Sequence, residues 1–294
     1  MATPVTAKKP KAARPARERI VLAPEERLET VLEVIRGARK RLVLSLFRCD
    51  EFKVLDELAE ALQRKVKVEV LLTRRAKGWR KKLKDLWRFL ESMGAKVYRY
   101  ADPVVKYHAK YIVADDGPAL VASLNFTRKC FTSTSDFMHL SYDSKVVSGL
   151  HSLFDTDRRA PESTFPEGIS ERLIVGPERA RRQMAELLEG ARRSIRIIDP
   201  KVTDPSMMAL LKAKKADGVE VEVLKKRVVG GLVSHGKMFM VDDETAVIGS
   251  MALAALSLDF RREVALMIRD PHCVSQLKDF FQRLAATPAE EKTA

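Results

Sequence analysis

The chain has 294 residues, of which 46% are hydrophobic and 32% are charged, and its net charge is +14. This balance is typical of a folded globular protein rather than a disordered one. No apolar run approaches the roughly 20 residues of a membrane-spanning helix, which argues against an integral membrane protein. The positive charge favours anionic partners, namely nucleic acid, anionic lipid or phosphorylated substrates.

The first 19 residues contain six basic side chains, three prolines and one acid, Glu18. They lack the apolar core of a secretory signal, and the prolines disfavour an amphipathic helix. We therefore predict a disordered basic tail over residues 1–22, which could hold the protein near a polyanion.

The remainder of the chain is a repeat of two halves. Gly37 and Gly190 lie 153 positions apart in matching helix-to-strand segments, and Val66 and Val219 lie 153 apart in matching apolar strands. A segment rich in proline, serine and charge separates the halves. The predicted divisions are a first half at 23–155, a linker at 156–170, a second half at 171–286 and a C-terminal tail at 287–294.

Each half alternates helical and apolar strand patterns, which indicates an α/β fold with a mixed, mainly parallel sheet flanked by helices. Residues 78–100 have no counterpart in the second half. Leu83, Leu86, Trp87 and Leu90 follow a helical spacing there, Gly94 suits a helix end, and an apolar strand follows. The first half is therefore expected to contain one additional helix and strand.

A His-x-Lys-x-x-x-x-Asp pattern occurs once in each half. Its six residues are His108, Lys110, Asp115, His235, Lys237 and Asp242. A serine follows each histidine by 15 positions and an acid follows it by 28. These residues are Ser123, Asp136, Ser250 and Glu263. Two copies with matched downstream residues are far less probable by chance than one copy, so we interpret the pattern as functional.

These residue types suit the cleavage of a phosphodiester. A neutral imidazole can attack phosphorus, and a protonated one can give its proton to the leaving oxygen. Lys110 and Lys237 are expected to bind the phosphoryl oxygens, because residues at i and i+2 face the same side of a strand. Asp136 and Glu263 are the candidates for orienting the histidines. Asp115 and Asp242, though candidate site residues, are expected to hold the strand-to-turn geometry.

No metal or other cofactor is expected at this site, since a lysine ammonium does not ligate a cation and repels it. The three cysteines, Cys49, Cys130 and Cys273, have no metal-binding spacing, and one would remain unpaired in any disulfide scheme. We therefore predict that they are packing residues in a protein of a reducing compartment such as the cytoplasm.

The paired motifs, followed by Ser-x-Asn-x-Thr or by Gly-Ser, resemble the phospholipase D superfamily over residues 25–155 and 172–285. Its members include phospholipases D, cardiolipin and phosphatidylserine synthases, and small endonucleases. The resemblance implies two similar α/β/α halves with one active site at their interface and a metal-free ping-pong reaction through a covalent phosphohistidine. By position, His108 and His235 are the nucleophile and acid/base pair, and Ser123, Asn125 and Ser250 would contact the substrate phosphate.

The second half departs from this pattern because Ala252 stands where the family has Asn. The more complete first half favours His108 as the nucleophile. Three functions remain open. We favour a phosphodiesterase or transferase that acts on phospholipid, with peripheral contact to an anionic membrane. The alternatives are a nuclease acting on DNA or RNA and a weakly active or non-catalytic phosphate-binding protein. The basic, aromatic segment around Trp79 and Trp87 suits either a membrane surface or nucleic acid.

Overall fold

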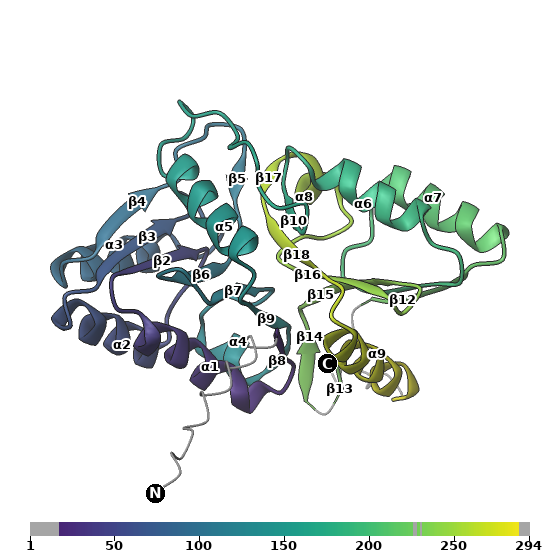
Figure 1. The fold of residues 1–294 in the computed structure, drawn as a ribbon, viewed down its shortest axis with the longest axis horizontal. Helices are drawn as coiled ribbons and strands as arrows, with labels where there is room; N and C mark the ends of the chain where they lie inside the picture. The colour runs from purple at the N-terminus through teal and green to yellow at the C-terminus, as the bar shows by residue number, and fades with distance from the viewer. Residues whose placement is uncertain (1–17, 226–227, 230, 288–294) are drawn as a thin grey trace, which may run out of the picture.

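A computed structural model describes residues 18–225, 228–229 and 231–287 of the chain. Figure 1 shows two α/β halves side by side, the first coloured purple to teal and the second green to yellow. Each half contains one large sheet, of seven strands in the first and six in the second. The predicted fold class, two similar halves of sheets flanked by helices, is confirmed.

The elements of the first half follow one another from the N-terminal strand to the long helix before the linker. They are β1 (Arg19–Val21), α1 (Pro24–Gly37), β2 (Arg41–Leu46), α2 (Phe52–Gln63), β3 (Lys67–Leu72), α3 (Arg80–Ser92), β4 (Lys96–Arg99), β5 (Lys106–Tyr107), β6 (Tyr111–Ala114), β7 (Ala119–Ala122), α4 (Arg128–Thr132), β8 (Thr134–Ser135), β9 (Met138–Ser141) and α5 (Ser144–Asp157).

The second half begins beyond the connecting segment. Its elements are β10 (Leu173–Val175), α6 (Ala180–Glu189), β11 (Ser194–Ile198), α7 (Pro205–Ala216), β12 (Glu220–Leu224), β13 (Val228–Val229), β14 (Leu232–Ser234), β15 (Lys237–Val241), β16 (Thr245–Gly249), α8 (Ala255–Asp259), β17 (Arg261–Arg262), β18 (Val264–Ile268) and α9 (Pro271–Ala286). The first two residues of the predicted linker, 156 and 157, therefore belong to α5.

Parallel pairing is confined to one side of each large sheet, at β2–β3–β4 and at β11–β12. The remaining pairs in these sheets are antiparallel, including β6–β7 and β15–β16, whose first strands lie within the two motifs. Helical crossovers join the parallel strands, and short turns join β6 to β7 and β15 to β16. The sheets are thus mixed as predicted, but they are mainly antiparallel rather than mainly parallel, because only three of the eleven strand pairs in the two large sheets are parallel.

The additional segment of the first half forms the helix and strand expected from the sequence. Leu83, Leu86 and Leu90 are the buried residues of α3, and Gly94 adopts φ +98° just beyond the helix end. β4 then extends the sheet by pairing in parallel with β3. In the second half, the corresponding position after β12 carries the short β13–β14 pair instead.

The prediction of a disordered tail over 1–22 is wrong for its last residues. β1 pairs antiparallel with β9 at the edge of the first sheet, and Ile20 and Val21 are buried. A three-residue strand beside a basic segment has too little local pattern to be recognised, because its stability comes from pairing with a strand distant in sequence. Residues 1–17 of the predicted tail lie outside the described residues.

The two halves share a hydrophobic core. Val121 of β7 belongs to the same buried cluster as Leu173, Val264 and Leu266 of the second half. On the other face of the first sheet, the side chains of β2 pack against α1 and α2. Burial of this apolar surface fixes the halves against each other, so residues from both can form one site.

The described helices include none with the combined length and apolar character required to cross a membrane.

Candidate active site

Each motif histidine follows a short strand that pairs with the opposite half. β5 pairs in parallel with β17, and the His108 amide continues this ladder by donating to the Arg262 carbonyl at 2.9 Å. β14 pairs in parallel with β8, and the His235 amide donates to the Ser135 carbonyl at 3.2 Å. The two histidines are therefore positioned by related exchanges of strands across the interface.

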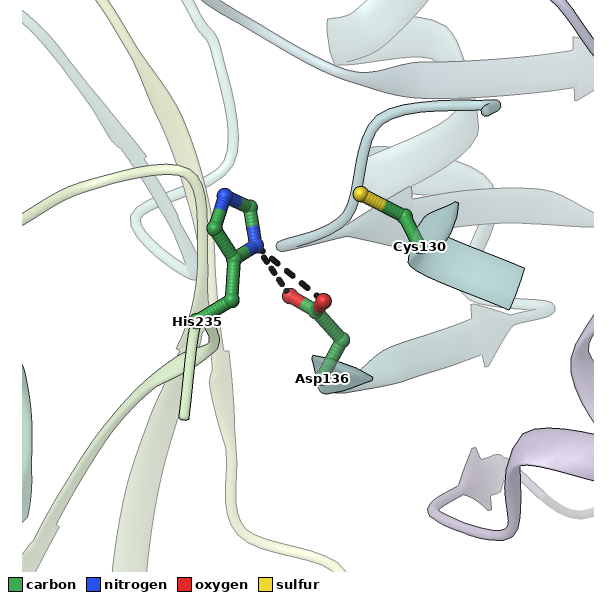
Figure 2. A group of neighbouring side chains, drawn as sticks. All are labelled: Cys130, Asp136 and His235. Carbon is green, nitrogen blue, oxygen red and sulfur yellow. Dashed lines mark hydrogen bonds and ion pairs between the residues drawn. The ribbon is translucent and has the colours of Figure 1, made fainter. Parts of the chain in front are cut away.

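These exchanges set which acid meets which histidine. Glu263 directly follows β17, and its Oε2 lies 2.8 Å from His108 Nδ1. Asp136 directly follows β8, and its Oδ1 lies 2.9 Å from His235 Nδ1. Figure 2 marks this contact with a dashed line. The acids predicted to orient the histidines do contact them, and each contacts the histidine of the other half.

A glycine permits the close approach around His235. A Cβ on Gly236 would lie 2.6 Å from the Phe137 ring and 2.9 Å from the Asp136 Cα atom. Any side chain at this position would therefore push apart the two backbones that bring His235 and Asp136 together.

The two carboxylates are completely buried and ionised. Burial alone raises their pKa, but the charge of the partner histidine and its hydrogen bond lower the pKa of both Asp136 and Glu263 overall. An ionised carboxylate accepts hydrogen bonds only, so Nδ1 of each imidazole donates and Nε2 remains for the substrate.

The two histidines differ in exposure. The side chain of His108 is 18% exposed and that of His235 is 35% exposed. Burial lowers the pKa of His108 in spite of the opposing effect of Glu263, which favours its neutral form. The Phe47 ring contacts the His108 ring edge-on, with 4.7 Å between centroids.

The motif lysines are both buried beside the histidines. Lys110 Nζ donates to the His108 carbonyl at 2.6 Å, and Lys237 Nζ donates to the His235 carbonyl at 2.8 Å. Burial lowers the pKa of Lys110 to about 7, with the charge of Lys237 acting in the same direction. The site thus concentrates positive charge, which a phosphate group would compensate.

Ser123 and Ser250 have contacts that favour a structural role over the predicted contact with substrate phosphate. Ser123 Oγ donates to Asp136 Oδ1 at 2.6 Å and accepts from the Phe137 amide at 2.9 Å. Ser250 Oγ accepts from the Val264 amide at 3.1 Å and donates to the same residue's carbonyl at 3.3 Å. Both side chains are buried and engaged with the strand that carries each acid.

Two hydroxyls that the sequence reasoning missed complete the binding of the acids. Thr134 Oγ1 donates to Asp136 Oδ2 at 2.6 Å, and Ser257 Oγ donates to Glu263 Oε1 at 2.9 Å. They stand two and six residues before their acids, so the repeat gives no matched offset by which to find them.

Asn125 is a separate case. It is 7% exposed, and its Oδ1 has no hydrogen-bond partner among the described residues. Its amide group is therefore available to a ligand in a way that the serine hydroxyls are not. At the matching position, Ala252 offers only its backbone amide, which donates to Ser257 Oγ at 2.9 Å.

The motif aspartates bind backbone amides at the far end of the strands that follow the histidines. Asp115 accepts from the amides of 39, 40 and 41, and Asp242 accepts from those of 192, 193 and 194. Both residues have positive φ, 47° and 56°. These contacts agree with the geometric role expected for them.

Comparisons with known proteins agree with this architecture. The family model described as "Cardiolipin synthase, PLD-like domain" matches residues 31–158 and 224–285, which include both motifs. No curated protein sequence gives a significant match.

Two solved structures share the fold. A polyphosphate kinase from Porphyromonas gingivalis superposes with a TM-score of 0.77 at 18% identity, over 93% of this chain and 48% of the kinase. A phosphatidylserine synthase from Haemophilus influenzae Rd KW20 superposes with a TM-score of 0.74 at 12% identity, over 92% of this chain and 86% of the synthase. The chain thus spans about half the length of the kinase and most of the synthase.

Proposed function

The chain belongs to the cardiolipin synthase, PLD-like domain family, and from this premise we propose that it is a phosphodiesterase or phosphatidyltransferase acting on phospholipids through a covalent phosphohistidine. The observation that carries the proposal is the pair of histidines, each held at Nδ1 by a buried carboxylate of the opposite half and accompanied by a buried lysine. The charge of Lys237 acts on both His108 and Lys110, which supports the inference that the two Nε2 atoms serve one substrate.

In the first step, the lone pair of His108 Nε2 forms a bond to phosphorus while the bond from phosphorus to the leaving oxygen breaks. Protonated His235 transfers its proton to that oxygen, which departs as an alcohol. In the second step, neutral His235 removes a proton from water or from an acceptor alcohol. The resulting oxygen nucleophile attacks phosphorus and releases His108.

The remaining polar groups stabilise the phosphoryl oxygens during both steps. Lys110 and Lys237 supply positive charge in a buried setting, where electrostatic stabilisation is stronger than in water. We assign the side-chain amide nitrogen Nδ2 of Asn125, a hydrogen-bond donor, to one phosphoryl oxygen. Ser123 and Ser250 act indirectly by holding the acid-bearing strands.

An apolar rim supports phospholipid as the substrate. Val104, Leu256 and Phe260 are large hydrophobic residues that are 65%, 42% and 49% exposed. They lie on segments adjoining the β5–β17 pair that leads into His108, and the Phe260 carbonyl accepts from the Lys106 amide. An exposed apolar rim beside a phosphodiester site suits a substrate with acyl chains.

A nuclease is the second candidate, supported by a basic surface on the other side of His108. Arg48 stacks on both Phe47 and Trp79, and Lys82 stacks on Trp79, so cations and aromatic rings extend from the site to α3. Exposed lysines and arginines continue along this helix. They are Arg80, Lys81, Lys82, Lys84 and Arg88. Such a surface also suits a polynucleotide.

The substrate class is tested by incubating the protein with EDTA and separate pools of diacyl phospholipid vesicles, plasmid, single-stranded DNA and RNA. We expect turnover of phospholipid that is abolished in His108→Ala and retained in His272→Ala, an exposed histidine outside the site. Turnover of nucleic acid alone, with affinity falling steeply as salt rises, would establish the nuclease instead. No turnover of any pool would favour a non-catalytic phosphate-binding protein, consistent with the loss of Asn at position 252.

A further inference from the structure

A cysteine lies against the His235–Asp136 pair. The thiol of Cys130, a carboxylate oxygen of Asp136 and a ring nitrogen of His235 all lie within 4.8 Å of one another. Figure 2 shows the three side chains converging from α4, from the residue after β8 and from the residue after β14. Among the residues that the structure describes, this is the group of cysteine, histidine and acid side chains that could share one metal ion.

The repeat indicates that this thiol is not needed to hold the acid. Cys130 and Ser257 both stand six residues before the acid of their half. Ser257 Oγ donates to Glu263, but in the first half the corresponding hydrogen bond to Asp136 comes from Thr134. The Cys130 thiol has no hydrogen-bond partner among the described residues, so it is available to a different ligand.

We propose that Cys130, Asp136 and His235 bind a soft divalent cation, with Zn²⁺ as the reference ion, and that binding arrests the enzyme. Thiolate, imidazole and carboxylate are the ligands that Zn²⁺ takes in proteins, and three protein ligands with one water or substrate oxygen form a common set. Small movements bring the three donor atoms to the spacing of a tetrahedral site, because they already face one another.

The bound ion would take the place of the proton between His235 Nδ1 and Asp136. An imidazole with metal on Nδ1 keeps its one proton on Nε2, and losing it would leave an imidazolate. Such a ring cannot alternate between acid and base. This inhibitory consequence rests on the proposed function, whereas the binding itself does not.

Local charge sets a limit on the affinity. Arg27, Arg48 and Lys110 all interact electrostatically with Cys130, and Arg27 also donates to the carbonyls of Cys130 and Asp136. These cations oppose a second positive ion, but a thiolate and a carboxylate together neutralise Zn²⁺. We therefore expect binding at micromolar rather than nanomolar concentrations.

Binding is tested with Co²⁺, whose thiolate complexes absorb in the near ultraviolet by charge transfer. The full chain should develop this band on titration, and Zn²⁺ should abolish it by competition. Cys130→Ser should lose the band and bind Co²⁺ on the order of 100-fold more weakly, because it loses its softest ligand. Ser is the matched replacement, since Ser257 occupies the equivalent position of the second half.

Cys273→Ser is the control, because this buried cysteine lies outside the group and its thiol already contacts a backbone carbonyl. It should keep the band. Absence of the band in the wild type, or its persistence in Cys130→Ser, would overturn the proposed site whether or not any substrate is turned over.

Inhibition is measured next with whichever substrate the wild type turns over. Micromolar Zn²⁺ should slow the wild type at least ~10-fold and Cys130→Ser less than ~2-fold, with EDTA restoring the wild-type rate. If the charge-transfer band appears but Zn²⁺ does not slow turnover, the proposed inhibition is wrong and the metal site still stands.

Discussion

The two halves carry the same machinery in unequal surroundings. His108 is the more buried histidine, is paired with a glutamate and has a lowered pKa, whereas His235 is about twice as exposed and is paired with an aspartate. The first half keeps Asn125, and the second has Ala252 in its place. This difference teaches how a duplicated module can divide one reaction: the drier, neutral imidazole suits attack on phosphorus, and the wetter one suits exchange of protons with the leaving group and water.

The halves are also interdependent, because each supplies the carboxylate for the other's histidine. A single half would hold a histidine without its acid and an acid without its histidine. The β5–β17 and β8–β14 pairs therefore do more than join two domains, since they assemble both catalytic pairs at once.

The largest expected effect separates the roles of the histidines. With a phosphodiester carrying a nitrophenyl leaving group, which needs no proton, His235→Asn should still form the phosphohistidine but hydrolyse it slowly. His108→Asn should form none, and its turnover should fall by about 10⁴-fold or more. The measurement is the base-stable, acid-labile phosphorus on each variant, located by peptide mass spectrometry. Labelled His235 in the His108→Asn protein would reverse our assignment.

A smaller effect tests the crossing of acids between halves. Glu263→Gln should slow phosphorylation of His108 by about 10³-fold, because an amide at Nδ1 no longer fixes the tautomer or stabilises the charge that forms. Asp136→Asn should instead leave the burst of nitrophenol nearly intact and slow the later hydrolysis by a similar factor. Stopped-flow measurement of the nitrophenol burst in the two variants shows which step each substitution slows. Because Glu263 contacts His108 and Asp136 contacts His235, the opposite assignment of slow steps would make His235 the nucleophile.

Turnover should also depend on the charge of Lys110. Its pKa of about 7 means that it loses its proton as pH rises through neutrality, so kcat/KM should fall by up to ~10-fold per unit above that point. His108, with its pKa lowered by burial, stays neutral over the same range and contributes no change there. Lys110→Arg should remove the descending limb of the profile, since guanidinium remains protonated. If kcat/KM of Lys110→Arg still falls above neutral pH, the fall is due to the titration of another group.

The sequence predicted the features that arise from local patterns. Apolar runs and matching offsets located most strands of the two large sheets, the insertion at α3 and β4, and the histidines, lysines and acids of the site. They did not locate β10 or the short strands β5, β8, β14 and β17 that pair across the halves. It could not assign each acid to its histidine. Each acid lies 28 residues past the histidine of its own half, and a repeat does not specify which copy packs against which. It also missed β1 and the position of Cys130, since both depend on contacts made only in the folded chain.

The smallest expected effect concerns the difference at position 252. Ala252→Asn restores to the second half the amide that Asn125 provides in the first, and one additional donor to a phosphoryl oxygen should raise kcat/KM by about 5-fold. Ala252 is buried, so the variant's melting temperature must be compared with that of the wild type. Ala254→Asn, at a neighbouring position of the same segment, is the matched control and should give no gain. If Ala252→Asn folds normally but leaves kcat/KM unchanged, the functional difference between the halves comes from the surroundings of the two histidines and not from the missing amide.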